Sequence, residues 1–204
     1  MSKIVLALCN KTPNILKHWK DAGYRCISVD LQFPPGITIM DGIECICADV
    51  LTYIPPFGEY EIVFCFPPCD DMAVSGARWF QLKGLKALIR SLQIVERCRD
   101  ICEQIGAPYF IENPVSTLAT YWRKPDYIFN PNEYAGYLEN PDQEAYTKKT
   151  CLWVGNGFVM PPKKPVNPVL GSKMHKLPPS PDRANLRSET PKGFSKAVFK
   201  YNKR

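Results

Sequence analysis

Two side chains that could do chemistry each follow a short apolar segment of this 204-residue chain. Cys69 comes after the apolar run 62–66 and a pair of prolines, and Glu112 comes after a second apolar run and directly before Asn113. An ionised thiol can act as a nucleophile, and a carboxyl group can bind a proton or accept hydrogen bonds. A cysteine in a chain with nine of them is ordinarily a buried, unreactive residue, and Glu112 could simply mark the surface. Their positions at the ends of predicted strands favour a functional role.

The two apolar runs predict strands that bring these side chains together. Residues 62–66 are wholly apolar, as expected for a strand covered on both faces of a parallel sheet. The two prolines stop this strand and leave a stiff loop, which places Cys69 beyond the carboxyl end. Residues 109–112 predict another short strand, which Asn113 and Pro114 end abruptly. Because ligands of open α/β sheets bind beyond the carboxyl ends of strands, Cys69 and Glu112 are expected in one crevice.

The start of the chain predicts a βαβ unit. Residues 3–9 predict a buried strand, Thr12 can cap a helix that begins at Pro13, and residues 24–30 predict a second strand. Asp30 closes this second strand, about where such units hold a ribose hydroxyl. Because the first loop is not rich in glycine, the alternative that Asp30 merely ends the strand stays open.

The alternation of strands and helices continues along the chain. Residues 43–50 predict a third strand that ends at Asp49, and residues 82–106 predict a long amphipathic helix with core cysteines. The aromatic stretch 121–147 either forms a lid that stacks on bases or covers the edge of the core, and residues 151–154 predict a late strand. The pattern predicts an α/β fold with a mostly parallel sheet and helices on both faces.

Length and composition favour a single domain over residues 1–204. It carries a basic, proline-rich region at 155–190 and a terminal helix at 191–203, which Phe194 and Val198 would dock on the core. No apolar run approaches the roughly 20 residues of a membrane span, and no signal peptide is visible, so a cytoplasmic protein with reduced thiols is expected. The cysteine and histidine spacings match no standard zinc site, so no metal is expected.

The charge of the chain is strongly asymmetric. Residues 1–147 hold 13 basic and 18 acidic side chains, whereas residues 148–204 hold 13 basic and 2 acidic ones, a net charge of +11. Such an excess suits a polyanion such as nucleic acid, although a solvated basic tail is the alternative.

Several segments resemble a known family. The Phe66-Pro67-Pro68-Cys69 and Glu112-Asn113-Pro114 sequences, about 40 residues apart, resemble the Pro-Cys and Glu-Asn motifs of the cytosine-5 DNA methyltransferases. The segments FPPC, AVSGARWF, YFIENPVSTL, YWRKPDY, TKKTCLW and RSETPKGF are similar to a compact group of phage and bacterial cytosine methylase-like proteins. The resemblance covers nearly the whole chain. It implies a Rossmann-like methyltransferase fold in the cytoplasm of a bacterium or a phage-infected host cell.

The resemblance also implies roles for individual residues. Cys69 is the thiolate that adds to carbon 6 of a flipped-out cytosine, Glu112 binds ring nitrogen 3 and the exocyclic amine, and Asn113 holds the loop. Lys148 or Lys149 stands nearest to the basic residue of the family that contacts the base carbonyl. The implied substrate contacts are Pro68, Ser75, Arg78 and Lys149. The implied contacts to S-adenosylmethionine are Leu8, Cys9, Asn10, Thr12, Asp30, Leu31, Asp49, Val50, Phe66 and Pro67.

Two departures from the family pattern keep other functions open. The first loop lacks the glycines that let the backbone approach S-adenosylmethionine, and no stretch is long enough for a separate target-recognition domain. Sequence specificity is therefore expected to be low or supplied by a separate partner. The alternatives are methylation of an exocyclic amine, methylation of a free nucleotide, and a catalytically inactive nucleic-acid-binding protein on a methylase fold.

Overall fold

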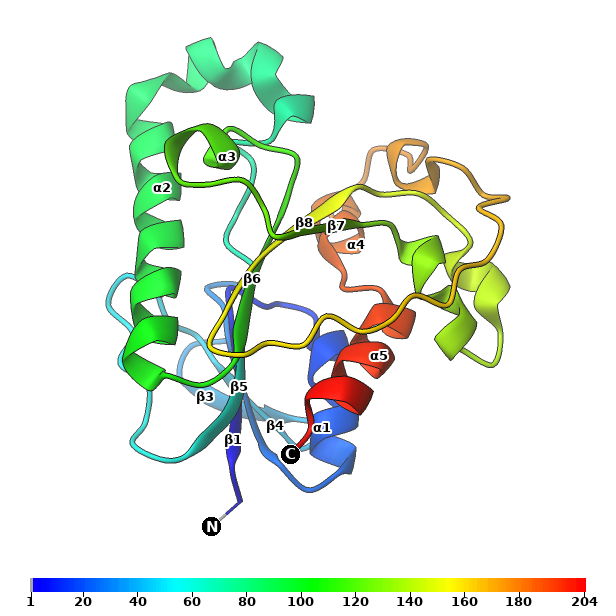
Figure 1. The fold of residues 1–204 in the computed structure, drawn as a ribbon. Helices are drawn as coiled ribbons and strands as arrows, with labels where there is room; N and C mark the ends of the chain where they lie inside the picture. The colour runs from blue at the N-terminus through cyan, green and yellow to red at the C-terminus, as the bar shows by residue number, and fades with distance from the viewer. Residues whose placement is uncertain (1) are drawn as a thin grey trace.

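One eight-stranded sheet forms the centre of the computed structural model, which describes residues 2–204 (Figure 1). Its strands lie in the order β3-β4-β2-β1-β5-β6-β8-β7. The five neighbours from β4 to β6 run parallel, while β3 is antiparallel to β4 and β8 is antiparallel to both β6 and β7. The predicted α/β class with a mostly parallel sheet is confirmed.

The elements have the following bounds. The strands are β1 Ile4–Leu8, β2 Arg25–Val29, β3 Ile37–Met40, β4 Ile43–Ile46, β5 Tyr60–Cys65, β6 Tyr109–Pro114, β7 Tyr127–Phe129 and β8 Thr150–Gly155. The α-helices are α1 Lys17–Asp21, α2 Phe80–Ile105, α3 Leu118–Tyr121, α4 Arg183–Ser188 and α5 Lys192–Asn202. Short 3-10 helices are η1 Pro13–Ile15, η2 Val74–Trp79, η3 Pro131–Glu133, η4 Ala135–Tyr137, η5 Pro141–Glu144 and η6 Lys173–His175.

Helices cover both faces of the sheet, α2 on one side and α1 with α5 on the other (Figure 1). Successive strand residues point to opposite faces, so Phe64 packs on the α1 and α5 side and Cys65 on the α2 side. Both faces of the strand are therefore buried, which explains why its sequence is wholly apolar. In α5, Phe194 and Val198 are buried, so the predicted docking of the terminal helix is confirmed.

The strand order reverses between β1 and β5. From β1 the chain first builds β2, β3 and β4 toward one edge and then returns to place β5 on the other side of β1. Loops that leave neighbouring strands in opposite directions open a crevice at such a switch point, and ligands of open α/β sheets bind there. The loop with Cys69 leaves β5 at this point.

Several predicted boundaries are wrong, each for a physical reason. The third strand ends at Ile46, and Asp49 lies in the turn that follows it. The strand expected to stop at Glu112 continues through Pro114, because β8 pairs with its last residues beyond the end of β5. Thr12 precedes η1 but its side chain makes no capping hydrogen bond.

The aromatic stretch 121–147 contributes mainly to the core. Phe129, Tyr134 and Tyr146 are buried, and the Tyr134 hydroxyl donates a hydrogen bond to the Pro161 carbonyl (3.1 Å). Tyr121 and Tyr127 are exposed. The basic, proline-rich region 155–190 contains η6 and α4. No helix in the described part of the chain combines the length and apolar character that a membrane span requires.

Candidate functional site

A tight turn holds Cys69 beyond the end of β5. The Phe66 N–H donates to the Leu8 carbonyl (3.0 Å), which carries the pairing of β5 and β1 one residue further. Pro67 is buried, Pro68 is exposed and Cys69 is half-buried. The Cys69 carbonyl accepts the N–H groups of both Met72 (3.0 Å) and Ala73 (2.8 Å). The backbone at Cys69 is therefore fixed from both sides.

Asn113 joins the loop with Cys69 to strand β6. Its Nδ2 atom donates to the Pro67 carbonyl (3.0 Å), and the residue is buried. Two further backbone bonds tie the same loop to the segment after β6, from Thr117 N–H to Met72 (2.9 Å) and from Val74 N–H to Val115 (3.1 Å). Cys69 and Glu112 thus sit on two segments that are connected directly by hydrogen bonds.

Replacing Asn113 with alanine should destabilise the protein by about 1–3 kcal/mol, because a buried hydrogen bond is lost and the Pro67 carbonyl is left without its partner. Urea unfolding measures the change. Asn167→Ala serves as the control, because Asn167 is exposed. Equal stabilities of the two variants would show that the Asn113 hydrogen bond does not hold this loop.

The surroundings of Cys69 keep its thiol protonated. Burial, together with the negative charges of Asp70 and Glu112, raises the pKa of Cys69 to about 11, while the positive charge of Lys148 acts in the opposite direction. The reactive species of a cysteine is the thiolate. The Cys69 thiol is therefore protonated at neutral pH.

The rate at which iodoacetamide alkylates Cys69 should rise about tenfold per pH unit from about pH 7 to about pH 9.5, since the raised pKa lies above this range. The thiolate fraction grows with pH until the pKa is reached, which sets the sign of the effect. Peptide mass spectrometry separates Cys69 from the other cysteines. A rate that levels off near the ordinary thiol pKa of about 8.5 would contradict this description.

Glu112 and Lys148 lie in one small pocket, which we name the aromatic pocket. Glu112 makes no hydrogen bond to any described residue, and burial raises the pKa of its carboxyl group while the charge of Lys148 lowers it. The two polar side chains therefore line the same pocket, and neither side chain forms a hydrogen bond or ion pair with a described residue. The pocket is lined by Phe66, Phe110, Glu112, Phe129, Lys148, Thr150, Glu189, Thr190, Pro191 and Phe194.

The aromatic pocket is nearly closed. It encloses room for about one water molecule. Residues 189–191, between α4 and α5, form one wall, and the Thr190 carbonyl accepts a hydrogen bond from Asn14 Nδ2 (3.4 Å). A planar ring can enter between the phenylalanines only if this segment or its neighbours move.

The residues expected to bind the cofactor come together only in part. The negative charges of Asp30 and Asp49 both raise the pKa of the Cys9 thiol, so the loops after β1, β2 and β4 do converge. Asp30 Oδ1 accepts the Gln32 N–H (2.8 Å), and burial raises the pKa of this carboxyl group. Both carboxylate oxygens of Asp49 already have partners: Oδ1 accepts the Leu51 N–H (3.0 Å), and Oδ2 pairs with Arg90 (3.0 Å).

Other residues predicted for the cofactor site face the protein interior or open solvent. Asn10 is buried and donates through Nδ2 to Ser28 Oγ (2.9 Å), while Ser28 Oγ donates to the Asn10 carbonyl (2.7 Å). Leu8 and Val50 are buried, Leu31 is 60% exposed, and Thr12 is half-buried. Cys9 has φ +53°, a left-handed conformation that suits the glycine expected in such a loop.

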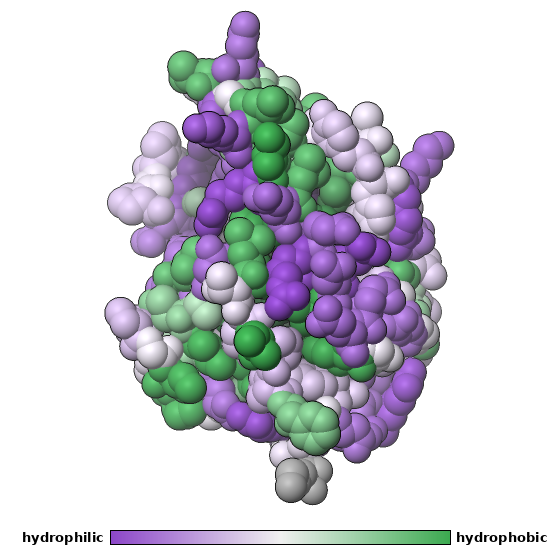
Figure 2. Space-filling view, turned by 90° about the vertical axis from the view of Figure 1, so that its left-hand side faces the viewer, coloured by the Kyte–Doolittle hydropathy of each residue, from purple (hydrophilic) through white to green (hydrophobic). Residues whose placement is uncertain are grey.

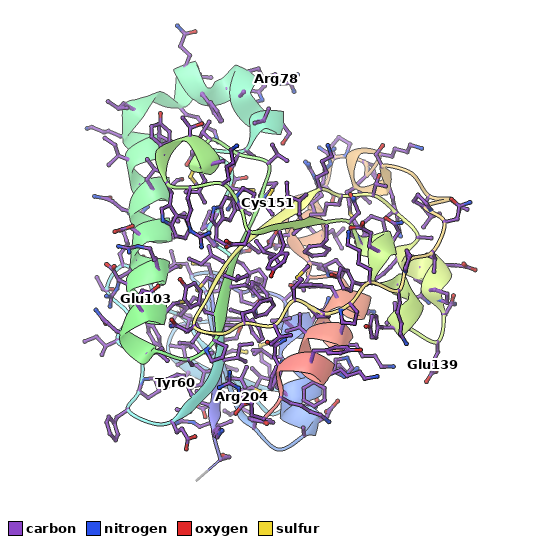
Figure 3. All side chains as sticks on the ribbon, in the orientation of Figure 1. Tyr60, Arg78, Glu103, Glu139, Cys151 and Arg204 are labelled. Atoms are coloured by element: carbon purple, nitrogen blue, oxygen red, sulfur yellow. The ribbon has the colours of Figure 1, made fainter. Side chains whose placement is uncertain are left out.

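Ser75 and Arg78 lie on a projecting arm formed by η2 and the first turns of α2. In Figure 3, Arg78 is at the tip of the arm, away from Cys151 on β8 beside the pocket. Both residues are exposed, as is Lys149, and the Arg78 guanidinium rests over the Trp79 ring (5.1 Å). Figure 2, which views the left-hand side of Figure 1, shows hydrophobic side chains among hydrophilic ones in its upper part. Trp79, Leu82 and Leu85 of the arm are exposed.

Sequence reasoning missed most of the pocket wall. The sequence leaves Phe129 open between a lid that stacks on bases and the edge of the core, and it predicts Phe194 only as a residue that docks the terminal helix. It places residues 189 and 190 in the basic tail and Pro191 at the start of that helix. Only the resemblance of the RSETPKGF segment to the cytosine methylase-like proteins indicated a role for this tail beyond its charge. No protein-family model matches the chain, and no curated protein is detectably similar to it in sequence.

Proposed function

We propose that the chain is an S-adenosylmethionine-dependent methyltransferase that acts on carbon 5 of cytosine in DNA through a covalent cysteine adduct. One observation carries the proposal. Cys69, just beyond β5, and an unpartnered, partly buried Glu112, inside the neighbouring strand β6, lie on two segments that Asn113 joins. Cysteine attack and carboxyl assistance at one planar ring require this pair of groups on one side of a sheet.

The chemistry of the pocket fits a cytosine ring. The carboxyl group of Glu112 would face ring nitrogen 3 and the exocyclic amine, and the Lys148 ammonium would donate to the base carbonyl oxygen. Four phenylalanines would contact the faces and edges of the ring. This arrangement satisfies donors and acceptors of the base without using any separate recognition domain, and the base must be flipped out to reach it.

Side chains of this protein and solvent account for the bonds and protons of adduct formation. Cys69 loses its proton to solvent, its sulfur forms a bond to carbon 6, and the electron pair of the 5,6 double bond shifts toward carbon 5 and the ring. Glu112, whose pKa is raised by burial, gives its proton to nitrogen 3 and neutralises the charge. Lys148 stabilises the polarised carbonyl. Base binding close to Lys148 would also favour the thiolate of Cys69.

The donor set near β1, β2 and β4 fits the adenosine part of S-adenosylmethionine. Asp30 uses Oδ1 internally, which leaves Oδ2 for ribose hydroxyls. Phe66 and Pro67 lie between this edge and the aromatic pocket. When bound there, the cofactor would supply the methyl group.

Asp30→Ala should weaken S-adenosylmethionine binding by about 1–3 kcal/mol, the scale of a hydrogen bond to a charged group. Titration calorimetry measures the dissociation constant. Asp41→Ala is the control, because Asp41 is an exposed acid at the β3–β4 turn. Unchanged affinity in Asp30→Ala would remove Asp30 from the site.

The experiment that tests the function is trapping of the adduct. A duplex that contains 5-fluorocytosine should form a stable complex in the presence of S-adenosylmethionine, because fluorine blocks the elimination that frees the enzyme. Mass spectrometry should place the adduct on Cys69, and Cys69→Ser should abolish it. Cys65→Ser changes a fully buried thiol 3.5 Å from Cys102 and should affect folding instead.

The second candidate function is nucleic-acid binding without catalysis, favoured by the raised pKa of Cys69. It predicts that the folded protein forms no adduct with any DNA or nucleotide substrate and methylates none of them. Methylation that survives Cys69→Ser with no adduct would point to an exocyclic amine. An adduct formed with a free nucleotide but not with DNA would point to a nucleotide substrate.

A further inference from the structure

A basic groove lies outside the aromatic pocket, on the face of the molecule that carries α1 and α5. It has a volume of about 480 Å³ and opens between α1, η4 and α5. We name it the lysine groove; its charged and aromatic lining comprises His18, Tyr137, Lys164, Lys196, Lys200 and Lys203.

No carboxylate of the described residues lines the lysine groove. None of its four lysines belongs to an ion pair in the described part of the chain, whereas Lys163, next in sequence to Lys164, is paired with Glu133 at 2.7 Å. Asp21, whose negative charge acts on the pKa of His18, is itself paired with Lys20 (2.8 Å). The positive charge of the groove is therefore uncompensated, which is the electrostatic signature of a polyanion site.

Three of the groove lysines lie on α5 or directly after it. Lys196 and Lys200 are four residues apart on one face of α5, a rise of about 6 Å, and Lys203 follows the last helical residue, Asn202. Phosphates of one DNA strand recur about every 3.4 Å along the duplex axis. Lys196 and Lys200 are therefore spaced by about the axial distance between phosphates two apart on one strand.

Aromatic rings lie close to three of the lysines, including Lys200, whose Nζ is 5.7 Å from the centre of the Tyr201 ring. Lys164 Nζ lies 4.8 Å from the centre of the Tyr137 ring, and Lys203 Nζ lies 5.1 Å from that of Phe199. The Phe199 ring also stacks on His18, with 6.0 Å between ring centres. These contacts reduce the freedom of long side chains before a ligand binds.

The helix α5 connects the lysine groove to the aromatic pocket. Phe194 in its first turn lines the pocket, and Lys196, Lys200 and Lys203 line the groove. Toward its other end the helix runs away from the pocket: in Figure 3, Arg204, just after α5, lies far below Cys151. One helix therefore presents its first turn to the pocket and its lysines to the groove.

We propose that the lysine groove binds the phosphate backbone of the DNA whose target base occupies the aromatic pocket. The proposal rests on the proposed function for the identity of that base. Its contacts would hold DNA irrespective of the DNA sequence. It provides a positioning surface, and none of its residues touches the reacting atoms.

The test measures binding of a 5'-labelled duplex of about 20 base pairs to Cys69→Ser protein, so that no covalent chemistry contributes. The triple variant Lys196→Gln, Lys200→Gln, Lys203→Gln should flatten the slope of log affinity against log salt by about 3, roughly one unit per phosphate contact. The matched control is Lys86→Gln, Lys124→Gln, Lys176→Gln, three exposed lysines outside the groove with the same total charge change. It should leave the slope nearly unchanged.

The chain contains two histidines, which makes His18 a convenient reporter. On titration with the same duplex, the ring signals of His18 should shift and saturate together with binding. Loss of one set of signals in His18→Gln assigns them. Binding without any change at His18 would place the DNA elsewhere and overturn the proposal.

A second arm separates failure of the groove from failure of the proposed function. With active protein, the groove variant should form less adduct on a 20-base-pair 5-fluorocytosine duplex and the same amount on a trinucleotide, which is too short to reach the lysines. If the parent protein forms no adduct on either substrate, the proposed function is wrong. The salt slopes then still test whether the lysine groove binds DNA. If both triple variants flatten the slope of log affinity against log salt equally, the lysine groove is not the DNA-binding site. Loss of binding to vesicles of anionic phospholipid in the groove variant, with DNA binding intact, would also overturn the proposal.

Discussion

Replacing Glu112 with glutamine should lower the rate of cytosine methylation by about 10²–10⁴-fold, the contribution expected of a positioned acid. Glutamine keeps the shape of the side chain but cannot give a proton to ring nitrogen 3. Because burial raises the pKa of Glu112, the folded protein binds this proton more tightly than the unfolded chain. Removing the charge should therefore increase stability at neutral pH, and the gain should vanish below the ordinary pKa of about 4.3. Single-turnover methylation and urea unfolding give the two readouts.

Glu139→Gln provides the matched control for this substitution. Glu139 is exposed at the far edge of the molecule from the sheet (Figure 3), and its replacement should change neither readout. A slow but more stable Glu112→Gln protein identifies a functional carboxyl group. Full methylation activity in Glu112→Gln would remove Glu112 from the chemistry, whatever happens to stability.

The parts of the fold that sequence predicts are those with strong local signals. Strand β5 is a pure apolar run stopped by two prolines, and α2 has helical periodicity that ends at Gly106, where φ is +72°. These two elements place the loop with Cys69, so the position of the thiol at a strand end could be predicted from local sequence. The connection between Asn113 and Pro67 could not, because it joins segments 46 residues apart.

The parts that sequence misses depend on pairing partners. The edge strand β3 carries exposed Ile37 and Ile39, so no buried face marks it as a strand. Proline usually ends a strand, but Pro114 pairs with Thr150 because β8 lies antiparallel to β6 beyond the end of β5. The wall at residues 189–191 arises only when α5 docks on the sheet, an arrangement that no local pattern reports.

Phe110 connects the core to the aromatic pocket. The residue is fully buried at the centre of β6, and its ring lies near those of Phe64 (4.9 Å between centres), Phe158 (5.5 Å) and Phe194 (6.0 Å). The same ring lines the pocket beside Glu112. Stability of the sheet and shape of the proposed base site therefore depend on one side chain.

Phe110→Ala should lower the free energy of unfolding by about 3–5 kcal/mol, since it removes buried apolar surface and leaves a cavity among aromatic rings. Most domains are stable by only about 5–15 kcal/mol, so the variant should unfold at much lower urea concentration than the parent protein. Phe57→Ala is the matched control, because the Phe57 side chain is fully exposed and its loss should leave the midpoint in place. Phe110→Leu keeps most of the volume and should retain most of the stability while loosening the pocket, which separates the two roles of the ring in an adduct assay. A Phe110→Ala midpoint equal to that of Phe57→Ala would show that β6 does not pack as described, and with it the placement of Glu112 would be lost.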